Sequence, residues 1–352
     1  MRVALSTASF VLLAAAATYT SASPLKKRQA FQPAAFDTWV WQDVSGTQCA
    51  DGSSTGIAYN AHADYNTKDL LIWFDSGGAC RDANTCFYNP TAWNLNGYTN
   101  YTFQNYARPA LESQILMTTR DPSRNNPWAN SHMLFVPYCT GDIHGGNNVI
   151  TYPNAPRPIY HKGYTNFQSI VSLASSSVPW IENIYVAGSS AGCYGAVINY
   201  VAVRQAWPSA TVHLVADSCE GVPGFLDAIP SWNLYQPSGN SCPDCVQGQF
   251  NSIVPALAQA NPRSRFAAIS YTVDDFLPYY MGTSLSDFAA LIKQYFINIT
   301  NTAGNMAKTF SVSGQAHGVF IRDTPGSSTD SALAAWLASM KNLGSNFTSQ
   351  SV

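Results

Sequence analysis

Six short apolar runs, separated by loops and helical stretches, constrain the fold of this chain more than any other feature. They are residues 70–74, 133–136, 184–187, 212–216, 266–271 and 308–312, of which the last is half polar. Most of them are continuously apolar rather than alternating, which is typical of strands buried on both faces of a mostly parallel sheet. Helical stretches at 165–175 and 191–206 lie between them, so we predict a doubly wound α/β domain.

The third run is followed by a motif that predicts a catalytic serine. Residues 188–192 read Gly-Ser-Ser-Ala-Gly, with a predicted strand before them and a predicted helix after them. G-x-S-x-G in this setting is typical of a sharp strand-to-helix turn that exposes the central serine. Both glycines are needed there because a side chain would collide with neighbouring backbone. We predict Ser190 as a nucleophile; the alternative is a small-residue turn that lets the helix pack closely.

A serine hydroxyl needs a base, and the order of residues in such folds is serine, acid, histidine. Of six histidines, only His213 and His317 follow Ser190. His213 lies inside an apolar run and is expected to pack in the core. His317 lies among small residues in a loop after the last predicted strand, where its ring can reach across to Ser190. We therefore predict His317 as the general base.

The acid is expected after a strand, between the serine and the histidine. Asp274 and Asp275 follow the fifth apolar run. Adjacent side chains diverge, so one carboxylate is expected to orient the imidazole and the other to cap a helix that begins near Phe276. Asp274 is favoured, and Asp275 and Asp217 remain alternatives.

Acyl transfer also requires donors for the developing oxyanion, and losing one typically costs ~10²–10³ in rate. One predicted donor is the backbone N–H of Ala191, directly after the serine. Gly77 and Gly78, which follow the first apolar run, allow further N–H groups to turn toward the site. The alternative is an ordinary Gly-Gly turn.

Five segments in this order resemble the pectin acetylesterase and Notum-type carboxylesterases. They are residues 73–80 (WFDSGGAC), 136–142 (VPYCTGD), 188–192 (GSSAG), 216–218 (ADS) and the loop around His317, together covering roughly residues 45–320. The resemblance implies an α/β-hydrolase fold with a mostly parallel central sheet and helices on both faces. It also implies chemistry without metal or cofactor.

By the same resemblance, Ser190, Asp274 and His317 would form the triad. The oxyanion hole would be formed by Gly77, Gly78 and Ala191. Two disulfides are implied, Cys49–Cys139 and Cys80–Cys86.

The chain departs from the family pattern at several positions. Ser76 replaces the first of three glycines, Ala79 replaces a tryptophan, and Cys193 stands where many members have glycine. The glutamine usually found soon after the acid is not evident past Asp274. We therefore expect a different pocket wall and a different acyl preference. His144, after the second apolar run, either lines the cleft or holds its own loop.

The N-terminus is typical of a secreted precursor. Arg2, an apolar run at 10–17 and small residues at 21–23 predict a signal peptide over residues 1–23. The basic residues 26–28 (Lys-Lys-Arg) predict a processing site that ends a propeptide at 24–28. The remainder, 29–352, is predicted to form a single catalytic domain.

Composition excludes some classes of function. Charged residues make up 11% of the chain, and the net charge is −2; removal of residues 1–28 leaves 14 basic and 20 acidic residues, a net charge of −6. No basic footprint for nucleic acid is present. No later stretch is long and apolar enough for a membrane span, so we expect a soluble mature protein.

Eight cysteines behind a signal peptide favour disulfides over metal ligation. The pairing of Cys193, Cys219, Cys242 and Cys245 stays open, and Cys242-Pro-Asp-Cys245 alone is a weak zinc pattern. Sequons at Asn100, Asn298 and Asn346 predict N-glycosylation of surface positions.

The functional prediction is a secreted, monomeric serine carboxylesterase. Its substrate, by resemblance, would be O-acetyl groups on plant cell-wall polysaccharide such as pectin. Trp93, Tyr98 and Tyr101 would stack on sugar rings if exposed. Two alternatives remain: a lipase or long-acyl esterase on the same scaffold, and a catalytically inactive secreted binding protein.

Overall fold

The computed structural model describes residue 31 and residues 35–352, apart from 226–228, 236, 238–241, 243–244, 246–247, 305, 323 and 343–345. The signal peptide and propeptide expected at 1–28, and the expected domain start at 29, lie outside the described residues.

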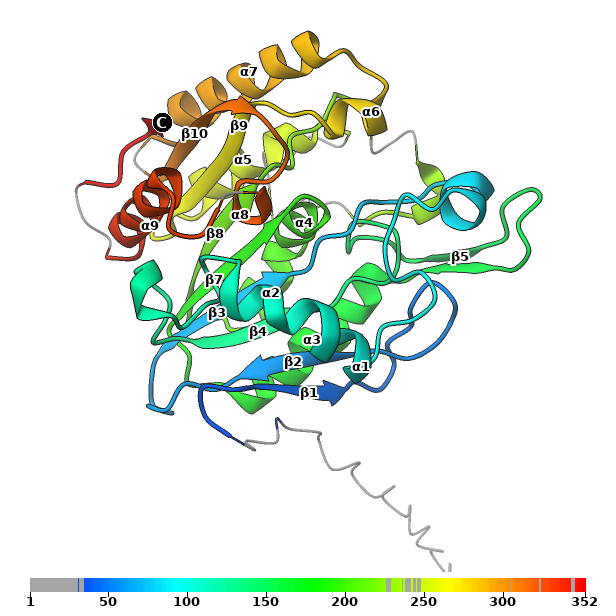
Figure 1. Cartoon of the computed structure of the whole chain (residues 1–352), viewed down its shortest axis with the longest axis horizontal. Helices are drawn as coiled ribbons and strands as arrows, with labels where there is room; N and C mark the ends of the chain where they lie inside the picture. The colour runs from blue at the N-terminus through cyan, green and yellow to red at the C-terminus, as the bar shows by residue number, and fades with distance from the viewer. Residues whose placement is uncertain are drawn as a thin grey trace, which may run out of the picture.

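A nine-stranded sheet forms the centre of the molecule, in the order β1-β2-β4-β3-β7-β8-β9-β10-β11 (Figure 1). Its strands are β1 (Trp39–Asp43), β2 (Gly56–Asn60), β3 (Asp69–Phe74), β4 (His132–Val136), β7 (Asn183–Ser189), β8 (Thr211–Asp217), β9 (Phe266–Val273), β10 (Ala307–Gln315) and β11 (Gln350–Ser351). All six apolar runs are strands, so that prediction is confirmed. A separate hairpin pairs β5 (Asn148–Ile150) with β6 (Ile159–His161).

Neighbouring strands pair in parallel along the part of the sheet that runs β4-β3-β7-β8-β9-β10-β11. At the other end, β2 pairs antiparallel with both β1 and β4. Parallel pairing brings the carboxyl ends of β3, β7, β8 and β9 to one edge of the sheet. The segments that follow these strands carry the predicted site residues.

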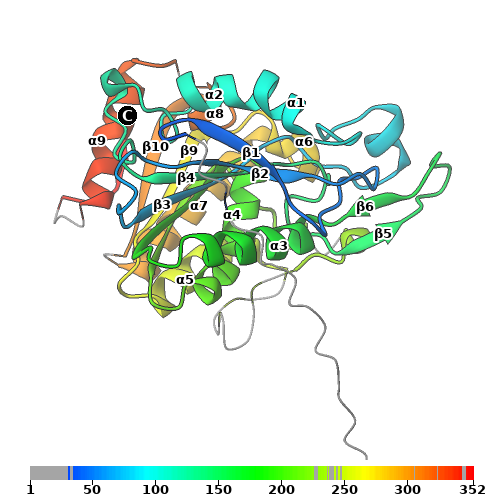
Figure 2. The same ribbon diagram turned by 90° about the horizontal axis from the view of Figure 1, so that it is seen from below.

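Helices cover both faces of the sheet, as Figure 2 shows. Leu70, Ile72 and Phe74 of β3 belong to a core shared with α3 (Gly163–Ser177), α4 (Ala191–Ala206), α5 (Ile253–Ala260) and α7 (Leu285–Ala303). Leu71 and Trp73 point the other way, into a core shared with α2 (Arg108–Ser113), α8 (Val319–Arg322) and α9 (Ser328–Lys341). This alternation buries both faces of the strand, and it confirms the predicted α/β class. Two further short helices are α1 (Asn100–Thr102) and α6 (Leu277–Met281).

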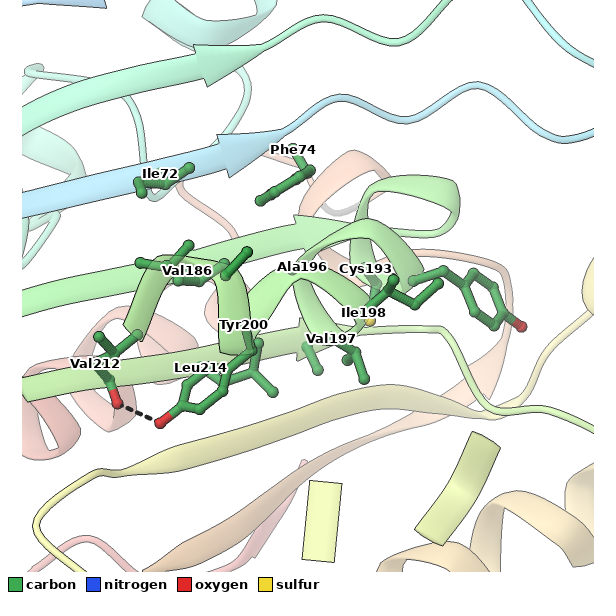
Figure 3. Close-up of a cluster of buried hydrophobic side chains, with 14 of the residues drawn as sticks. Ile72, Phe74, Val186, Cys193, Ala196, Val197, Ile198, Tyr200, Val212 and Leu214 are labelled. Atoms are coloured by element: carbon green, nitrogen blue, oxygen red, sulfur yellow. Dashed lines mark hydrogen bonds between the residues drawn. The ribbon is translucent and has the colours of Figure 1, made fainter. Parts of the chain in front are cut away.

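Helix α4 is the central helix of the first core, and it begins directly after the predicted nucleophile. Figure 3 shows Ala196, Val197 and Tyr200 of α4 packed against the apolar side chains of β7 and β8. The Tyr200 hydroxyl donates a hydrogen bond of 2.8 Å to the carbonyl of Val212. A helix anchored in this way holds its N-terminus in a fixed position at the sheet edge.

Four disulfides link Cys49–Cys139, Cys80–Cys86, Cys193–Cys219 and Cys242–Cys245. The first two agree with the pairs that the family resemblance implied. Cys193 and Cys219 join the first turn of α4 to the loop after β8, which accounts for cysteine in place of glycine at 193. The Cys242-Pro-Asp-Cys245 thiols pair with each other instead of offering zinc ligands.

Within the described residues, no helix has the length and apolarity to cross a membrane.

Candidate active site

Ser190 lies at the turn between β7 and α4, in a backbone conformation that residues other than glycine rarely adopt. Its φ is 55° and its ψ is −126°. A Cβ added to Gly188 would lie 2.3 Å from the carbonyl oxygen of Gly192, and one added to Gly192 would lie 2.1 Å from that of Phe74. The predicted reason for both glycines is therefore confirmed. The Ser190 N–H donates to the carbonyl of Asp217 at 2.9 Å, which fixes the turn against β8.

The structure brings His317 to Asp274. Nδ1 of His317 lies 2.6 Å from Oδ2 of Asp274, and both side chains are buried. The other carboxylate oxygen of Asp274 accepts from the N–H groups of Phe276 and Leu277 at 2.8 Å each. Asp275 is exposed, and the N–H groups at the start of α6 donate to Asp274. The expectation that one acid orients the imidazole while the other caps the helix is therefore wrong. Asp274 itself both contacts the imidazole and caps α6.

Nε2 of His317 is buried and has no hydrogen-bond partner within the described residues. The ring of Phe276 stacks on the imidazole, with 5.0 Å between ring centroids. Since Nδ1 is directed at a carboxylate, Nε2 is the nitrogen left to exchange a proton with a nucleophile.

The Asp217 carboxylate makes its hydrogen bonds to groups other than the His317 ring, and it joins the serine turn to the histidine turn. Its Oδ2 accepts from the hydroxyl of Ser189 at 2.6 Å and from the N–H of Phe320 at 3.0 Å. Its Oδ1 accepts from Val319 at 3.0 Å. Burial raises the pKa of Asp217, and these hydrogen bonds oppose that rise. Sequence reasoning considered this residue as a triad acid and missed its linking role.

The glycine loop after β3 lies beside the serine turn. The Ser76 hydroxyl donates to the carbonyl of Ser189 at 2.6 Å, so the residue that replaces the family's first glycine ties the two segments together. Gly78 has a φ of 71°, and a Cβ there would lie 2.1 Å from the carbonyl of Thr91. Within the described part of the chain, the N–H groups of Gly77, Gly78 and Ala191 donate no hydrogen bond to the protein. These three donors therefore remain free for a ligand oxygen.

A small apolar cavity opens at Ser190. It measures about 30 Å³, which is room for about two or three water molecules when each needs roughly 10–15 Å³. The acyl cavity, as we call it, is lined by Gly78, Ala79, Ile143, Ser190, Ala191, Tyr194, Phe225, Trp232, Phe276, Leu277, Tyr280 and Met281. Trp232 forms the wall next to Ala79, and its Nε1 donates to the carbonyl of Cys80 at 2.8 Å. No local sequence signal marks Trp232, because it reaches the site from a loop more than forty residues past the serine.

The other histidines with candidate roles are structural in their contacts. His144 is buried, its Nε2 lies 2.8 Å from the carbonyl of Asp75, and its ring stacks on Tyr138. Burial lowers the pKa of His144 to about 4. Of the two roles left open for this residue, the contacts favour holding the loop. His213 is buried in β8 against Tyr185, as expected for a core residue.

A buried carboxyl lies behind the triad candidates. Glu220 follows β8, and its Oε2 has no hydrogen-bond partner within the described residues; the same holds for the hydroxyls of Ser270 and Tyr295. Burial, with smaller contributions from the charges of Asp274 and Asp217, raises the pKa of Glu220 to about 8. This carboxyl is therefore mostly protonated at neutral pH.

Two of the three aromatic residues that were predicted to stack on sugar rings are exposed. Trp93 is 70% exposed, and the backbone N–H of this residue donates to the carbonyl of Gly77 at 2.8 Å. Tyr101 is also exposed, whereas Tyr98 is 1% exposed and belongs to the core. Tyr98 is therefore not a stacking candidate.

The three sequon asparagines, Asn100, Asn298 and Asn346, are all exposed.

The sheet order, the serine turn after β7 and the histidine–acid pair at the same edge define the class of α/β-hydrolases. Comparison with known families matches residues 32–256, more than half of the chain, to the family described as Pectinacetylesterase. This chain belongs to the pectinacetylesterase family. The match includes Gly77, Gly78 and Ser190; Asp274 and His317 lie beyond it.

Curated relatives are carboxylesterases. The chain is 26% identical over 178 residues to palmitoleoyl-protein carboxylesterase NOTUM of Mus musculus, covering 48% of this chain and 33% of that protein. It is 26% identical over 190 residues to notum1 of Xenopus laevis, covering 50% and 32%, and 25% identical over 177 residues to NOTUM of Homo sapiens, covering 48% and 33%. The matched region thus spans about a third of each relative. Family and relatives together support hydrolysis of ester bonds.

Proposed function

We propose that this protein is a secreted serine carboxylesterase that removes O-acetyl groups from cell-wall polysaccharide such as pectin. The single observation that carries the proposal is the acyl cavity at Ser190. Its volume of about 30 Å³ accommodates a methyl group, and its lining is apolar. A long-chain acyl group, such as the palmitoleoyl group in the relatives' names, needs a far larger cavity. This difference favours an acetylesterase over the lipase alternative.

In the proposed mechanism, Ser190 attacks the ester carbonyl while Nε2 of His317 takes the hydroxyl proton. Asp274 holds the imidazole so that Nδ1 carries a proton and Nε2 is free to accept one; the 2.6 Å contact supports this role. The oxyanion of the tetrahedral intermediate would accept hydrogen bonds from Gly77, Gly78 and Ala191. Preorganised backbone donors of this kind act where charge develops in the transition state.

His317 then protonates the leaving sugar hydroxyl, and the acetyl group remains on Ser190. Water attacks the acyl-enzyme by the same route in reverse, with His317 first as base and then as acid. Acetate leaves, and the serine is regenerated. None of these steps calls for a metal or cofactor.

A polysaccharide is the favoured alcohol because an exposed aromatic ring, that of Trp93, lies next to the proposed oxyanion loop. Trp93 is attached to that loop through the carbonyl of Gly77 and presents most of its ring to solvent. Aromatic faces of this kind pack well on sugar rings. Secretion fits the disulfides, since such bonds persist in oxidising compartments.

The experiment is acetate release from acetylated pectin, acetylated xylan and triacylglycerols, with p-nitrophenyl acetate and palmitate as small-ester references. We expect acetate from pectin and rapid cleavage of the acetate ester but not the palmitate ester. Ser190→Ala should fold and lose hydrolysis, which would also exclude an inactive binding protein. Unchanged hydrolysis by Ser190→Ala would contradict the proposed site.

A further inference from the structure

A second cavity adjoins the acyl cavity. It measures about 240 Å³ and shares Ala79, Phe225, Trp232 and Tyr280 with it. We call it the outer cavity; it is lined further by Cys80, Arg81, Thr85, Thr91, Ile229 and Tyr279. Since the two cavities share four lining residues, the outer cavity lies beside an ester bound at Ser190, within reach of a neighbouring unit of the polymer. The outer cavity is large enough for part of a sugar unit.

Among the described residues that line the outer cavity, Arg81 is the one that carries a charge. Its guanidinium is held by two contacts: Nη1 donates to the carbonyl of Tyr280 at 3.1 Å, and Cζ lies 5.9 Å from the ring centroid of Phe225. No carboxylate within the described residues lies at ion-pair distance from it. The neighbouring Asp82 is engaged elsewhere, since its Oδ1 accepts from the N–H and the hydroxyl of Thr85.

A guanidinium held in this way binds planar anions. The remaining N–H donors of Arg81 match the two oxygens of a carboxylate, and such charge-assisted pairs are stronger than neutral hydrogen bonds. The surrounding chain carries more acidic than basic residues, 20 against 18. A polyanionic substrate therefore needs a local cation to approach the serine.

Tyr279 adds a surface for a sugar ring at the same place. It is 79% exposed, lines the outer cavity and meets Tyr280 edge to face with 6.0 Å between ring centroids. An aromatic face beside a fixed cation suits a sugar that carries a carboxylate better than a neutral sugar.

We propose that the outer cavity is a subsite for the carboxylate of a uronic acid unit, with Arg81 as its anion-binding residue and Tyr279 as its stacking surface. The proposal rests on the proposed function for its substrate, because the uronic acid would belong to the polymer whose acetyl ester lies at Ser190. It assigns the preference for an acidic polysaccharide to a particular side chain.

The first test compares acetylated polygalacturonate with its methyl-esterified form, in which the carboxylates are neutral. Wild-type protein should show a kcat/KM for acetate release that is about tenfold higher on the charged polymer, mostly through KM and decreasing with added salt. Arg81→Gln should lose this discrimination, and Arg81→Lys should recover part of it. Arg263→Gln is the matched control, because Arg263 is exposed at the opposite edge of the sheet, between α5 and β9. It should keep the wild-type preference.

The second test does not depend on polysaccharide hydrolysis. Trigalacturonate should competitively inhibit cleavage of p-nitrophenyl acetate, with an inhibition constant that rises about tenfold in Arg81→Gln, while neutral xylotriose should inhibit both proteins equally weakly. If Arg81→Gln keeps both the discrimination and the inhibition, the subsite proposal is overturned. If trigalacturonate inhibition depends on Arg81 but no polymer releases acetate, the subsite stands and the proposed substrate fails.

Discussion

The hydroxyl of Ser189 donates a hydrogen bond of 2.6 Å to the buried carboxylate of Asp217, and that carboxylate also accepts from the turn that follows His317. The residue before the proposed nucleophile and two residues shortly after the proposed base, Val319 and Phe320, thus share one acceptor. A Cβ added to Gly318 would lie 2.8 Å from the same Ser189 hydroxyl, so the two turns are in contact.

Replacing Asp217 should therefore impair catalysis without removing a reacting group. Asp217→Asn loses one acceptor oxygen and shifts the turn that carries His317, and displacement of about 1 Å can cost roughly 10²-fold in rate. We expect a lower kcat on p-nitrophenyl acetate with little change in KM. A wild-type kcat in this variant would show that the link does not position the base. Asp43→Asn, an exposed change in β1, is a control that should leave kcat at its wild-type value.

The adjacent acids Asp274 and Asp275 offer a matched pair of variants. Asp274→Asn should reduce kcat by about 10³–10⁴, because an amide next to Nδ1 favours the wrong imidazole tautomer. Asp275→Asn should remain close to wild type, since its side chain is exposed. Steady-state kinetics on p-nitrophenyl acetate measures both, and the reverse order of effects would assign the acid to Asp275.

The acyl cavity predicts a dependence of rate on chain length that a single tryptophan controls. Trp232→Ala should raise kcat/KM for hexanoate relative to acetate by roughly tenfold, because it removes the wall beside Ala79. The change should also cost about 3–5 kcal/mol of stability. Trp336→Ala, in α9 on the other face of the sheet, removes an equally buried ring and should lose stability without changing the chain-length ratio. An unchanged ratio in Trp232→Ala would argue that the acyl group binds elsewhere.

Glu220 predicts a pH dependence of stability. Its pKa is about 8 in the folded protein and near 4.5 when unfolded, so the folded state holds a proton that the unfolded state releases between these values. Its contribution to the free energy of unfolding is thus complete below pH 4.5 and is lost as the pH rises to 8, by up to ~1.4 kcal/mol per pH unit.

Glu220→Gln mimics the protonated acid at every pH. Urea unfolding of this variant should show a stability gain over wild type that is smallest near pH 4.5 and grows toward pH 8. Glu112→Gln, at an exposed position on α2, should show no such trend beyond its surface ion pair with Arg108. A gain that stays constant with pH would mean that Glu220 is ionised in the folded protein.

Much of the fold was predictable because its strands are apolar on both faces. Strands β3, β4, β7, β8 and β9 each contain such a run, β10 contains a half-polar one, and the G-x-S-x-G motif located the turn after β7. Strand β1 was missed because it lies at the edge of the sheet, where a half-polar segment such as Trp39–Asp43 suffices. Strand β2 is buried between β1 and β4, but its apolar run in Gly56–Asn60 is only three residues long. The pairing of Cys193 with Cys219 was also beyond prediction, since it depends on how α4 packs beside the loop after β8.

The candidate site was predictable only as far as chain order carries chemistry. Ser190, Asp274 and His317 follow the expected order after successive strands, and the structure places Asp274 and His317 in contact. The contributions of Trp232, Asp217 and Glu220 arise from contacts between segments far apart in the chain. No local sequence pattern predicts that a side chain will close a cavity or accept hydrogen bonds from two turns.

The central claim is that His317 activates Ser190, and covalent labelling tests it most directly. The protein would be treated with a fluorophosphonate, and the modified peptide would be identified by mass spectrometry. We predict one adduct per molecule, on Ser190, forming at least ~10³-fold more slowly in His317→Ala. An adduct on another residue, or an equal rate in the histidine variant, would contradict the account.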